Sequence, residues 1–276
     1  MTVLTRGSTV LIVAYGITEL DLSWVPTDGD VVVVHNDDRL TPDACDHPGV
    51  RHVEPGANVG FGAGMNLALA EVTTDRVILC NPDTALTVDH FRALDAAAAE
   101  PVISTVPLLE ADGTPNAVVN PYWSVPAFLA TAYRLGRFAP RGGRARDAAS
   151  RLLGRNGAEH LGALAQGSGE WSIHDRWVSG AVFSAPTAEL RSVGGFDEDY
   201  FLYFEDADLH QRLAVANPDL VVRMADIEPA HHFVGGSAGG GGDVVARHRF
   251  RSARTYASRQ PGVAWRVAER ALVGPR

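Results

Sequence analysis

Carboxylates and aromatic residues alternate between residues 194 and 213, in the stretch GGFDEDYFLYFEDADLHQRL. A solvated acidic surface needs no aromatic side chains, and a buried strand does not tolerate so many acids. A carboxylate held against apolar side chains loses hydration, which raises its pKa and makes it a better general base at neutral pH. We therefore expect acid–base chemistry from some of these carboxylates: Asp197, Glu198, Asp199, Glu205, Asp206 and Asp208.

The second half of this stretch predicts a helix over residues 205–216, bounded by Asn217 and Pro218. Asp206 falls on one helical stripe with Leu209 and Leu213, so it is expected on the buried side of the helix. Asp208 and Arg212 stand four residues apart and are expected to form an ion pair, with a phosphate contact by Arg212 as the alternative. Glu205 at the helix start suits the helix dipole, so capping and substrate contact both stay open for it.

A sheet must position these groups, and the sequence predicts one from short runs of β-branched residues. Runs of this kind are typical of strands buried on both faces of a parallel sheet. They alternate with helical segments, which predicts an open, mostly parallel sheet covered by helices. The expected strands are 9–14, 31–35, 51–55, 76–80, 101–109 and 178–185, and the expected helices before residue 110 are 60–72 and 87–100, with 17–25 as a further candidate.

Polar side chains follow three of these predicted elements at the edge where ligands bind in open α/β sheets. Asn36 and Asp37 follow the second strand, Asn58 and Asn66 flank the glycines of NVGFGAGMN, and NPDT with Asn81 and Asp83 follows the fourth strand. Together they indicate a nucleotide pocket.

The glycines of GFGAG differ from a dinucleotide-binding fingerprint. That fingerprint follows the first strand of the fold, whereas these glycines follow the third, and Met65 stands where its last glycine belongs. A Rossmann dehydrogenase is therefore disfavoured, and the glycines are expected to allow close packing or a close approach of backbone to ligand.

The ordered set NVGFGAGMN, NPDT, VSGAVFSAPTAELRSVGGFDEDYFLYFEDADLHQRL and HHFVGGS resembles the inverting glycosyltransferases of family 2, in their bacterial rhamnosyltransferase-like branch. The resemblance covers residues 9 to about 240. Gly16 and His35 depart from it, because family members usually carry Asn and Asp there. It implies the GT-A fold: a Rossmann-like, mostly parallel central sheet flanked by helices, with a small antiparallel sheet on the acceptor side.

The same resemblance implies roles for individual residues. Asp206, with Glu205, would be the catalytic base; Asp83 would bind Mg²⁺ or Mn²⁺, joined by His231 or His232, between which the sequence does not choose. The nucleotide-sugar site would comprise Tyr15, Asn36, Asp37, Asn58, Gly60, Gly62, Asn66, Asn81 and Gly180, and the acceptor side Asp197, Asp208 and Arg212.

The activity implied is metal-dependent, inverting transfer of a sugar from a nucleotide-sugar, of dTDP-rhamnose or UDP-hexose type, to a hydroxyl of a cell-envelope glycan or lipid-linked saccharide. The alternative is an inactive homologue that binds a sugar-nucleotide or glycolipid as a subunit. A sugar-1-phosphate nucleotidyltransferase is disfavoured, because AYGITEL after the first strand lacks the Arg and Lys that such an enzyme needs.

Charge is distributed unevenly along the 276 residues. The net charge is −9 and all 24 basic residues are Arg, yet residues 134–155 carry a net charge of +6 and residues 244–276 one of +7. An acidic body with two basic segments argues against nucleic-acid binding and fits a local anionic target, such as a phosphate group or a membrane surface. These segments could contact a membrane peripherally or form the interface of a homodimer.

The expected organisation is one domain over residues 1–243, with a nucleotide-sugar-binding half (1–110) and an acceptor-side half (111–243), followed by a basic helical tail (244–276). The Gly-rich loop 235–243 is expected to act as a lid. With two cysteines, no apolar run long enough to span a bilayer, and an N-terminus interpreted as a strand, we expect a cytoplasmic protein, or one bound at the inner face of the plasma membrane.

Overall fold

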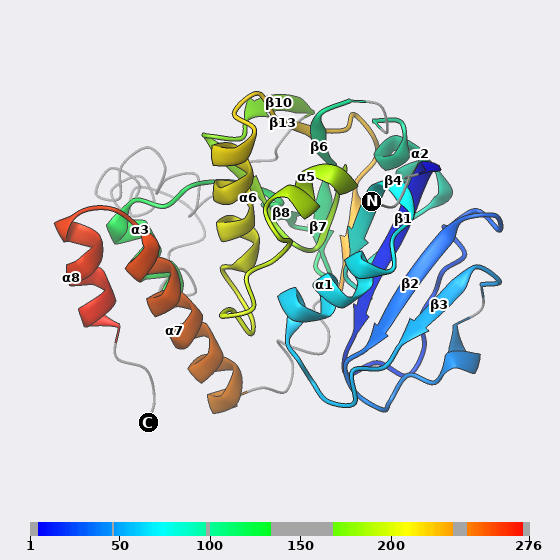
Figure 1. The fold of residues 1–276 in the computed structure, drawn as a ribbon, viewed down its shortest axis with the longest axis horizontal. Helices are drawn as coiled ribbons and strands as arrows, with labels where there is room; N and C mark the ends of the chain where they lie inside the picture. The colour runs from blue at the N-terminus through cyan, green and yellow to red at the C-terminus, as the bar shows by residue number, and fades with distance from the viewer. Residues whose placement is uncertain (1–4, 46, 98–99, 134–167, 234–241, 273–276) are drawn as a thin grey trace.

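The computed structural model describes residues 5–45, 47–97, 100–133, 168–233 and 242–272. Within these residues the chain folds around an eight-stranded sheet of order β10-β13-β6-β12-β4-β1-β2-β3 (Figure 1). Only β10 and β12 run against the direction shared by the others, so the predicted α/β fold with a mostly parallel sheet is confirmed. The strands are β1 (Thr5–Ala14), β2 (Asp30–His35), β3 (Val50–Val53), β4 (Thr74–Cys80), β6 (Val102–Thr105), β10 (Gly169–Ser172), β12 (Val182–Pro186) and β13 (Val221–Met224).

The centre of this sheet follows directly from its apolar runs. Leu11 of β1 lies opposite Val32 of β2 on one side and Leu79 of β4 on the other, and all three are buried. Strands β1 and β2 also end together, because Ala14 is paired with His35. Residues that follow these strands are therefore delivered to one edge of the sheet.

Helices α1 (Phe61–Ala70), α2 (Val88–Asp95), α5 (Thr187–Ser192) and α6 (Glu205–Ala216) accompany the sheet. The predictions of helices at 60–72, 87–100 and 205–216 are confirmed, the second ending earlier than expected. Thr87 starts α2 with a capping box, in which the His90 side chain takes the position that Glu or Gln usually holds.

The candidate helix at 17–25 is wrong. Leu20 pairs with Cys45 in an isolated bridge, and Leu20, Leu22 and Trp24 are buried. The buried Val25 donates its N–H to the Leu22 carbonyl at 2.9 Å in a turn. Contacts with the rest of the fold therefore override the weak helical pattern.

Two small sheets stand beside the main one, as the fold prediction required. Strand β11 (Arg176–Val178) pairs antiparallel with β9 (Val119–Pro121). The other sheet has the order β5-β14-β7-β8, from Thr84–Ala85, Ala230–His232, Leu108–Glu110 and Pro115–Asn116. The strand predicted at 101–109 is thus divided into β6 and β7, with Pro107 between them.

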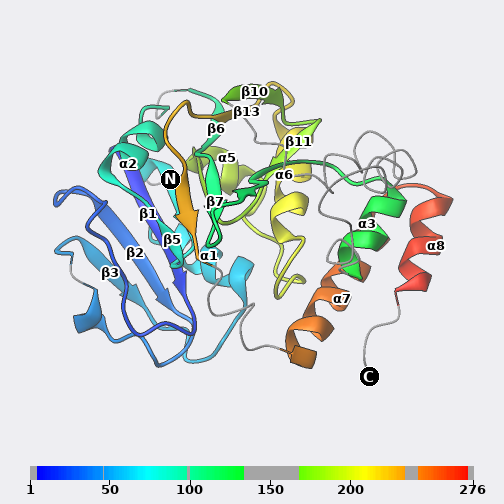
Figure 2. The same ribbon diagram turned by 180° about the vertical axis from the view of Figure 1, so that it is seen from behind.

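The end of the molecule opposite β2 and β3 is helical (Figures 1 and 2). Helices α3 (Val125–Ala132), α7 (Gly242–Arg259) and α8 (Val263–Ala271) meet there. The basic helix expected from residue 244 is therefore two helices, separated at Pro261 and at Gly262, whose φ is +102°. An aromatic second core joins them to α6: Trp123, Ala127, Phe128, Ala132, Trp177, Tyr200, Phe204, Ala207, Ala253, Tyr256, Ala257 and Leu272.

Among the described residues no helix is both long and apolar enough to cross a bilayer. Cys45 and Cys80 are free and buried. The Arg-rich stretch 134–155, and residues 235–241 of the predicted Gly-rich lid, lie outside the described residues.

Candidate functional site

A cavity of about 470 Å³ opens at the edge where β1, β2 and β4 end. Tyr15 follows β1, Asn36 follows β2, and Asn81 with Asp83 follows β4; all four line this cavity. The predicted convergence of the strand-end residues is therefore observed. We call this cavity the nucleotide-side cavity.

Asn36 anchors the glycine loop to the end of β2. Its side-chain amide donates to the Gly60 carbonyl at 3.1 Å and accepts from the Val59 backbone N–H at 3.0 Å. Gly60 has φ +90° and ψ 175°, a conformation essentially restricted to glycine. A Cβ at this position would collide with the backbone carbonyl oxygen of Phe201, which accepts a hydrogen bond from the Phe61 N–H at 3.0 Å.

Several predicted nucleotide-site residues hold the loops and do not line the cavity. The Asp37 carboxylate accepts from the Gly16 N–H at 2.8 Å. The Asn66 side-chain amide donates to the Phe196 carbonyl and accepts from the Phe196 N–H, each at 2.8 Å. Gly62 lies against the Phe196 side chain, where an added Cβ would come within 3.0 Å of the Phe196 Cβ. Asn58 differs, because it lines the cavity and also accepts from the Gly60 N–H at 3.0 Å.

A second cavity, of about 350 Å³, continues from the first. The two share Phe61, Asn81, Asp83 and Leu202 in their walls. The second cavity, here called the carboxylate-side cavity, is also lined by Gly180, Glu205, Asp206 and His232. Asp83 therefore stands at the junction, and one continuous cleft holds the strand-end residues and the acids of α6.

The two residues that precede the acids of α6 have a strained backbone. Tyr203 and Phe204 both have φ of +72°, a left-handed conformation that costs a non-glycine residue about 1–2 kcal/mol. Such strain persists only where the surrounding structure enforces it. Here Phe204 is buried in the second core, 5.3 Å from the Trp123 ring centroid. This turn sets where helix α6 begins, and therefore where Glu205 and Asp206 lie.

Asp206 is held by two backbone donors. Its carboxylate accepts from the Gly180 N–H at 3.2 Å and from the Ala207 N–H at 2.8 Å. The SGA motif at 179–181 thus positions the carboxylate from the neighbouring loop. Burial raises the pKa of Asp206 above the ordinary aspartate range, although these backbone hydrogen bonds oppose the shift. It remains a stronger proton acceptor than an exposed aspartate.

Glu205 is the more deeply buried of the two acids, at 5% exposure. Its Oε2 has no hydrogen-bond partner among the described residues, although backbone hydrogen bonds from Glu205 and Tyr203 to the carboxylate act to lower its pKa. Burial, and then the neighbouring Asp206 charge, raise the pKa of Glu205 strongly. Glu205 therefore keeps its proton more readily than Asp206, which leaves Asp206 to carry the charge.

The two candidate metal-binding histidines face different surroundings. Antiparallel pairing of β14 with β5 sets His232 opposite Thr84 and brings its Nε2 to 3.3 Å from Asp83 Oδ1. The exposed His231 stacks on Phe233 instead. Within the described residues no three His, Cys, Asp or Glu side chains are grouped as a metal site. Asp83 and His232 could supply part of a coordination sphere that a bound diphosphate and water complete.

The predicted acceptor-side residues lie on a different surface from Asp206. Asp208 pairs with Arg212 at 2.7 Å, as the helical spacing predicts. Arg259 of α7 reaches both Asp197, at 2.7 Å, and Asp208, at 3.4 Å. These residues line a separate cavity with Arg259 and do not line the carboxylate-side cavity. Their network joins α7 to α6.

Helix α7 also contributes residues to the cleft that the sequence did not single out. Val244, Val245 and His248 line the nucleotide-side cavity, where the His248 ring stacks on Phe201 with centroids 4.0 Å apart. The next residue, Arg249, lines the carboxylate-side cavity. The basic pattern around RHRFR was the available signal, but it gave no indication that this helix returns to the sheet edge.

Aromatic side chains form another wall of the carboxylate-side cavity. Trp123 and Trp177 line it with Tyr203 and Phe204, and the two tryptophan rings lie 5.0 Å apart. The sequences around them, NPYWSVP and DRWVSG, indicate a turn and a strand and do not suggest that the two side chains meet. Only the pairing of β9 with β11 brings them together.

Comparison with known proteins supports this assignment of the motifs. No family model matches the chain. Two curated sequences named N-acetylglucosaminyl-diphospho-decaprenol L-rhamnosyltransferase, from Mycobacterium tuberculosis strains CDC 1551 / Oshkosh and ATCC 25618 / H37Rv, are each 29% identical over 215 residues. The match covers 67% of this chain and 60% of each relative.

Solved structures resemble the chain more distantly. Staphylococcus aureus TarS 1–349 gives a TM-score of 0.49 at 13% identity, covering 97% of this chain and 69% of that one. Mannosyltransferase PcManGT from Pyrobaculum calidifontis, in complex with GDP-Man and Mn²⁺, gives 0.46 at 16% identity with the same coverages. Scores this low do not by themselves establish a shared fold. The curated relatives confirm the resemblance drawn from the motifs: over two thirds of its length this chain is similar to bacterial rhamnosyltransferases.

Proposed function

We propose that this chain is a metal-dependent, inverting glycosyltransferase of the GT-A type, which transfers a sugar from a nucleotide-sugar to a hydroxyl group. The observation that carries the proposal is the continuous cleft in which Asp83 and His232 stand between the strand-end residues and Asp206. A nucleotide, a diphosphate and an acceptor hydroxyl need that order of sites.

The donor would lie along the nucleotide-side cavity, with its nucleoside near Tyr15 and Asn36 and its diphosphate toward Asp83. Cavities of about 300–1,000 Å³ are typical of small-ligand sites, and this one measures about 470 Å³. A Mg²⁺ or Mn²⁺ ion held by Asp83 and His232 would neutralise the diphosphate and make it a better leaving group.

Asp206 would act as the general base. Its carboxylate is fixed by Gly180 and Ala207, and its raised pKa suits proton removal from an alcohol as the hydroxyl oxygen attacks the anomeric carbon. The glycosidic bond forms as the bond to the diphosphate breaks, so one displacement inverts the anomeric centre. Glu205, holding its proton, would keep a second negative charge away from this carboxylate.

The relatives suggest the kind of substrate. Their name states an L-rhamnosyl group and a diphospho-decaprenol-linked N-acetylglucosamine. For this chain we propose a nucleotide-activated rhamnose or hexose as donor, and a cell-envelope or lipid-linked saccharide as acceptor. The aromatic wall of Trp123 and Trp177 would suit the apolar face of an acceptor sugar.

A catalytically inactive, sugar-nucleotide-binding subunit is the competing function. It would bind its ligand equally well with and without metal and would show no turnover. The cleft favours the enzyme, because it holds a carboxylate with a raised pKa, Asp206, as well as the Asp83–His232 pair.

The first test is a donor screen with UDP-, GDP- and dTDP-sugars, each with Mn²⁺ or with EDTA, following the melting temperature and the slow release of nucleotide. We expect one donor to stabilise the protein with metal only. Asp83→Ala should abolish that stabilisation, whereas Asp206→Asn should keep it and lose acceptor-dependent turnover. Asp89→Asn on the surface of α2, where the side chain is 74% exposed, is the control. Binding without metal dependence and without turnover would favour the inactive subunit.

A further inference from the structure

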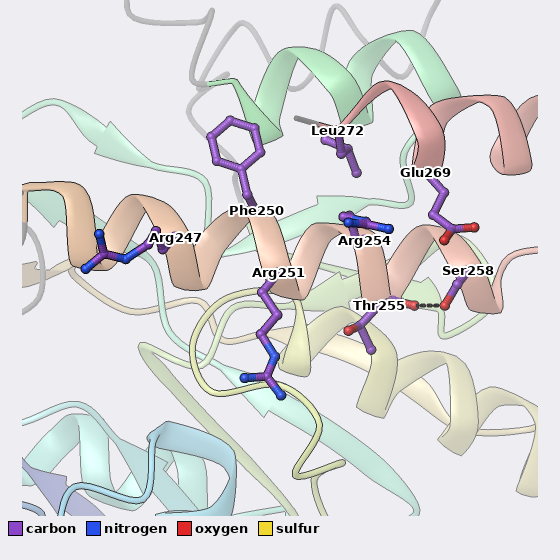
Figure 3. A pocket seen from close by; sticks show the side chains of 8 residues that line it. All are labelled: Arg247, Phe250, Arg251, Arg254, Thr255, Ser258, Glu269 and Leu272. Atoms are coloured by element: carbon purple, nitrogen blue, oxygen red, sulfur yellow. Dashed lines mark hydrogen bonds between the residues drawn. The ribbon is translucent and has the colours of Figure 1, made fainter. Parts of the chain in front are cut away.

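The outer surface of helix α7 carries a row of unpaired cations. Arg247, Arg251 and Arg254 are exposed, and helical spacing places them along one stripe. They line a groove with Phe250 and Leu272. In the view of Figure 3, Arg254 lies toward α8, whereas Arg251 extends from the opposite side of α7. Within the described part of the chain none of the three arginines forms an ion pair, and Glu269 is the one acid lining the groove. We call the three arginines and this groove the hairpin face.

Helix α8 adds a second exposed stripe, made of Val263, Arg266, Val267 and Arg270. Val263 is 66% exposed and Val267 61% exposed. Solvent-exposed valines that alternate with arginines are unfavourable for a helix facing only water. They are typical of a helix that lies at a membrane interface, where apolar side chains dip in and cations meet lipid phosphates.

We propose that the hairpin face docks on a bilayer containing anionic lipid. Charge complementarity supports this occupant, because residues 244–276 carry a net charge of +7 within a chain of net charge −9. Apart from residues 134–155, which lie outside the described residues, the rest of the chain is acidic and would be repelled by an anionic bilayer. A nucleic acid fits less well, because the two stripes offer valines and no exposed aromatic side chain for stacking bases.

Docking through the hairpin face would place the cleft close to the lipid surface. Val244, Val245 and His248 line the nucleotide-side cavity on the same helix that carries Arg247 and Arg251. The usefulness of this arrangement for a lipid-linked acceptor rests on the proposed function, but the docking itself does not. It can be measured as binding, without any transfer reaction.

The test is sedimentation of the full-length protein with phosphatidylcholine vesicles, with or without about 30% phosphatidylglycerol. We compare the wild type with Arg247→Gln/Arg251→Gln/Arg254→Gln and with the charge-retaining control Arg247→Lys/Arg251→Lys/Arg254→Lys. A basic residue near an anionic surface strengthens binding about fivefold, so the glutamine variant should bind on the order of a hundredfold more weakly. The lysine control should bind nearly as the wild type does.

Further measurements keep the outcome clear. Binding of the wild type should weaken as salt is raised, because screening shortens the reach of surface charges to about 10 Å at 0.1 M. Unchanged melting temperatures would show that the variants fold. The proposal is overturned if phosphatidylglycerol does not strengthen vesicle binding by the wild type, or if the glutamine variant binds as tightly as the wild type. It is also overturned if sedimentation velocity without vesicles shows a dimer that the glutamine variant abolishes, since a second copy would then cover this face.

Discussion

Gly60→Ala should damage both stability and donor binding, and its effect can be worked from the structure. The backbone at Gly60, with φ +90° and ψ 175°, would cost alanine about 1–3 kcal/mol in strain. The new Cβ would also collide with the Phe201 carbonyl oxygen, and losing the Phe61–Phe201 hydrogen bond adds about 1 kcal/mol. The expected total is roughly 2–4 kcal/mol, which corresponds to a melting temperature lower by about 5–15 °C.

Gly56→Ala is the matched control. Gly56 has φ +77°, but nothing lies within 4 Å of a Cβ built on it. It should therefore lose only the backbone term, about 1–2 kcal/mol, and keep donor binding. The assays are thermal unfolding and the KM for the donor that the screen identifies. If the two variants lose equal stability and both keep the wild-type KM, the close contact of the glycine loop with Phe201 does not shape the cleft, and this reasoning fails.

Three further predictions concern the acids, the second core and the cleft wall. A buried carboxyl whose pKa is raised in the folded state binds its proton more tightly there than when unfolded, so wild-type stability should fall as pH rises from about 4.3 toward the raised pKa of Glu205. Thermal unfolding of Glu205→Gln should show a smaller fall between pH 5 and pH 8; an identical fall in both proteins would contradict the assignment. Trp123→Ala should cost about 3–5 kcal/mol in chemical denaturation, since it empties the centre of the second core; a cost below about 1 kcal/mol would mean that the core does not depend on it. His248→Ala should raise the donor KM several-fold with kcat nearly unchanged, because the ring lines the nucleotide-side cavity and contacts none of the acids; a selective loss of kcat would place it in the chemistry instead.

The sheet and its edge could be predicted because their signals are local. Runs such as VVVVH and RVILC are buried on both faces wherever they pair, and Asn36, Asn81 and Asp83 follow strands whose carboxyl ends must share an edge. Helical spacing also placed Asp206 on the buried side of its helix, but Asp206 is only half-buried, whereas Glu205 and Asp208 are buried. That His232, and not His231, lies beside Asp83 depends on the pairing of β14 with β5, a register that no local pattern reveals.

The rest of the site depends on distant contacts. Asp208 and Arg212 had the spacing of a pair, and a helix turns Asp208 by about 200° from Asp206, away from the cleft. Their third partner, Arg259, lies 51 residues after Asp208 and could not be predicted from spacing. The hydrogen bonds between Asn66 and Phe196 join residues that are 130 apart in sequence. Trp123 and Trp177 meet only after β9 and β11 pair. Contacts of such range arise from the assembled fold and leave no periodic signal.

The second core has a thermodynamic consequence for the molecule as a whole. Phe204, which precedes the two acids, and Tyr256, on the inner side of α7, lie in one aromatic cluster with ring centroids 5.8 Å apart. On the proposed docking, ordering of α7 by a bilayer would act through this cluster on the turn that precedes Asp206. If such ordering tightens the hold on a substrate by some factor, linkage requires that the substrate tighten the external contact by the same factor. Under that linkage the protein would leave a membrane surface more readily when its cleft is empty, and would stay longer when the cleft is filled.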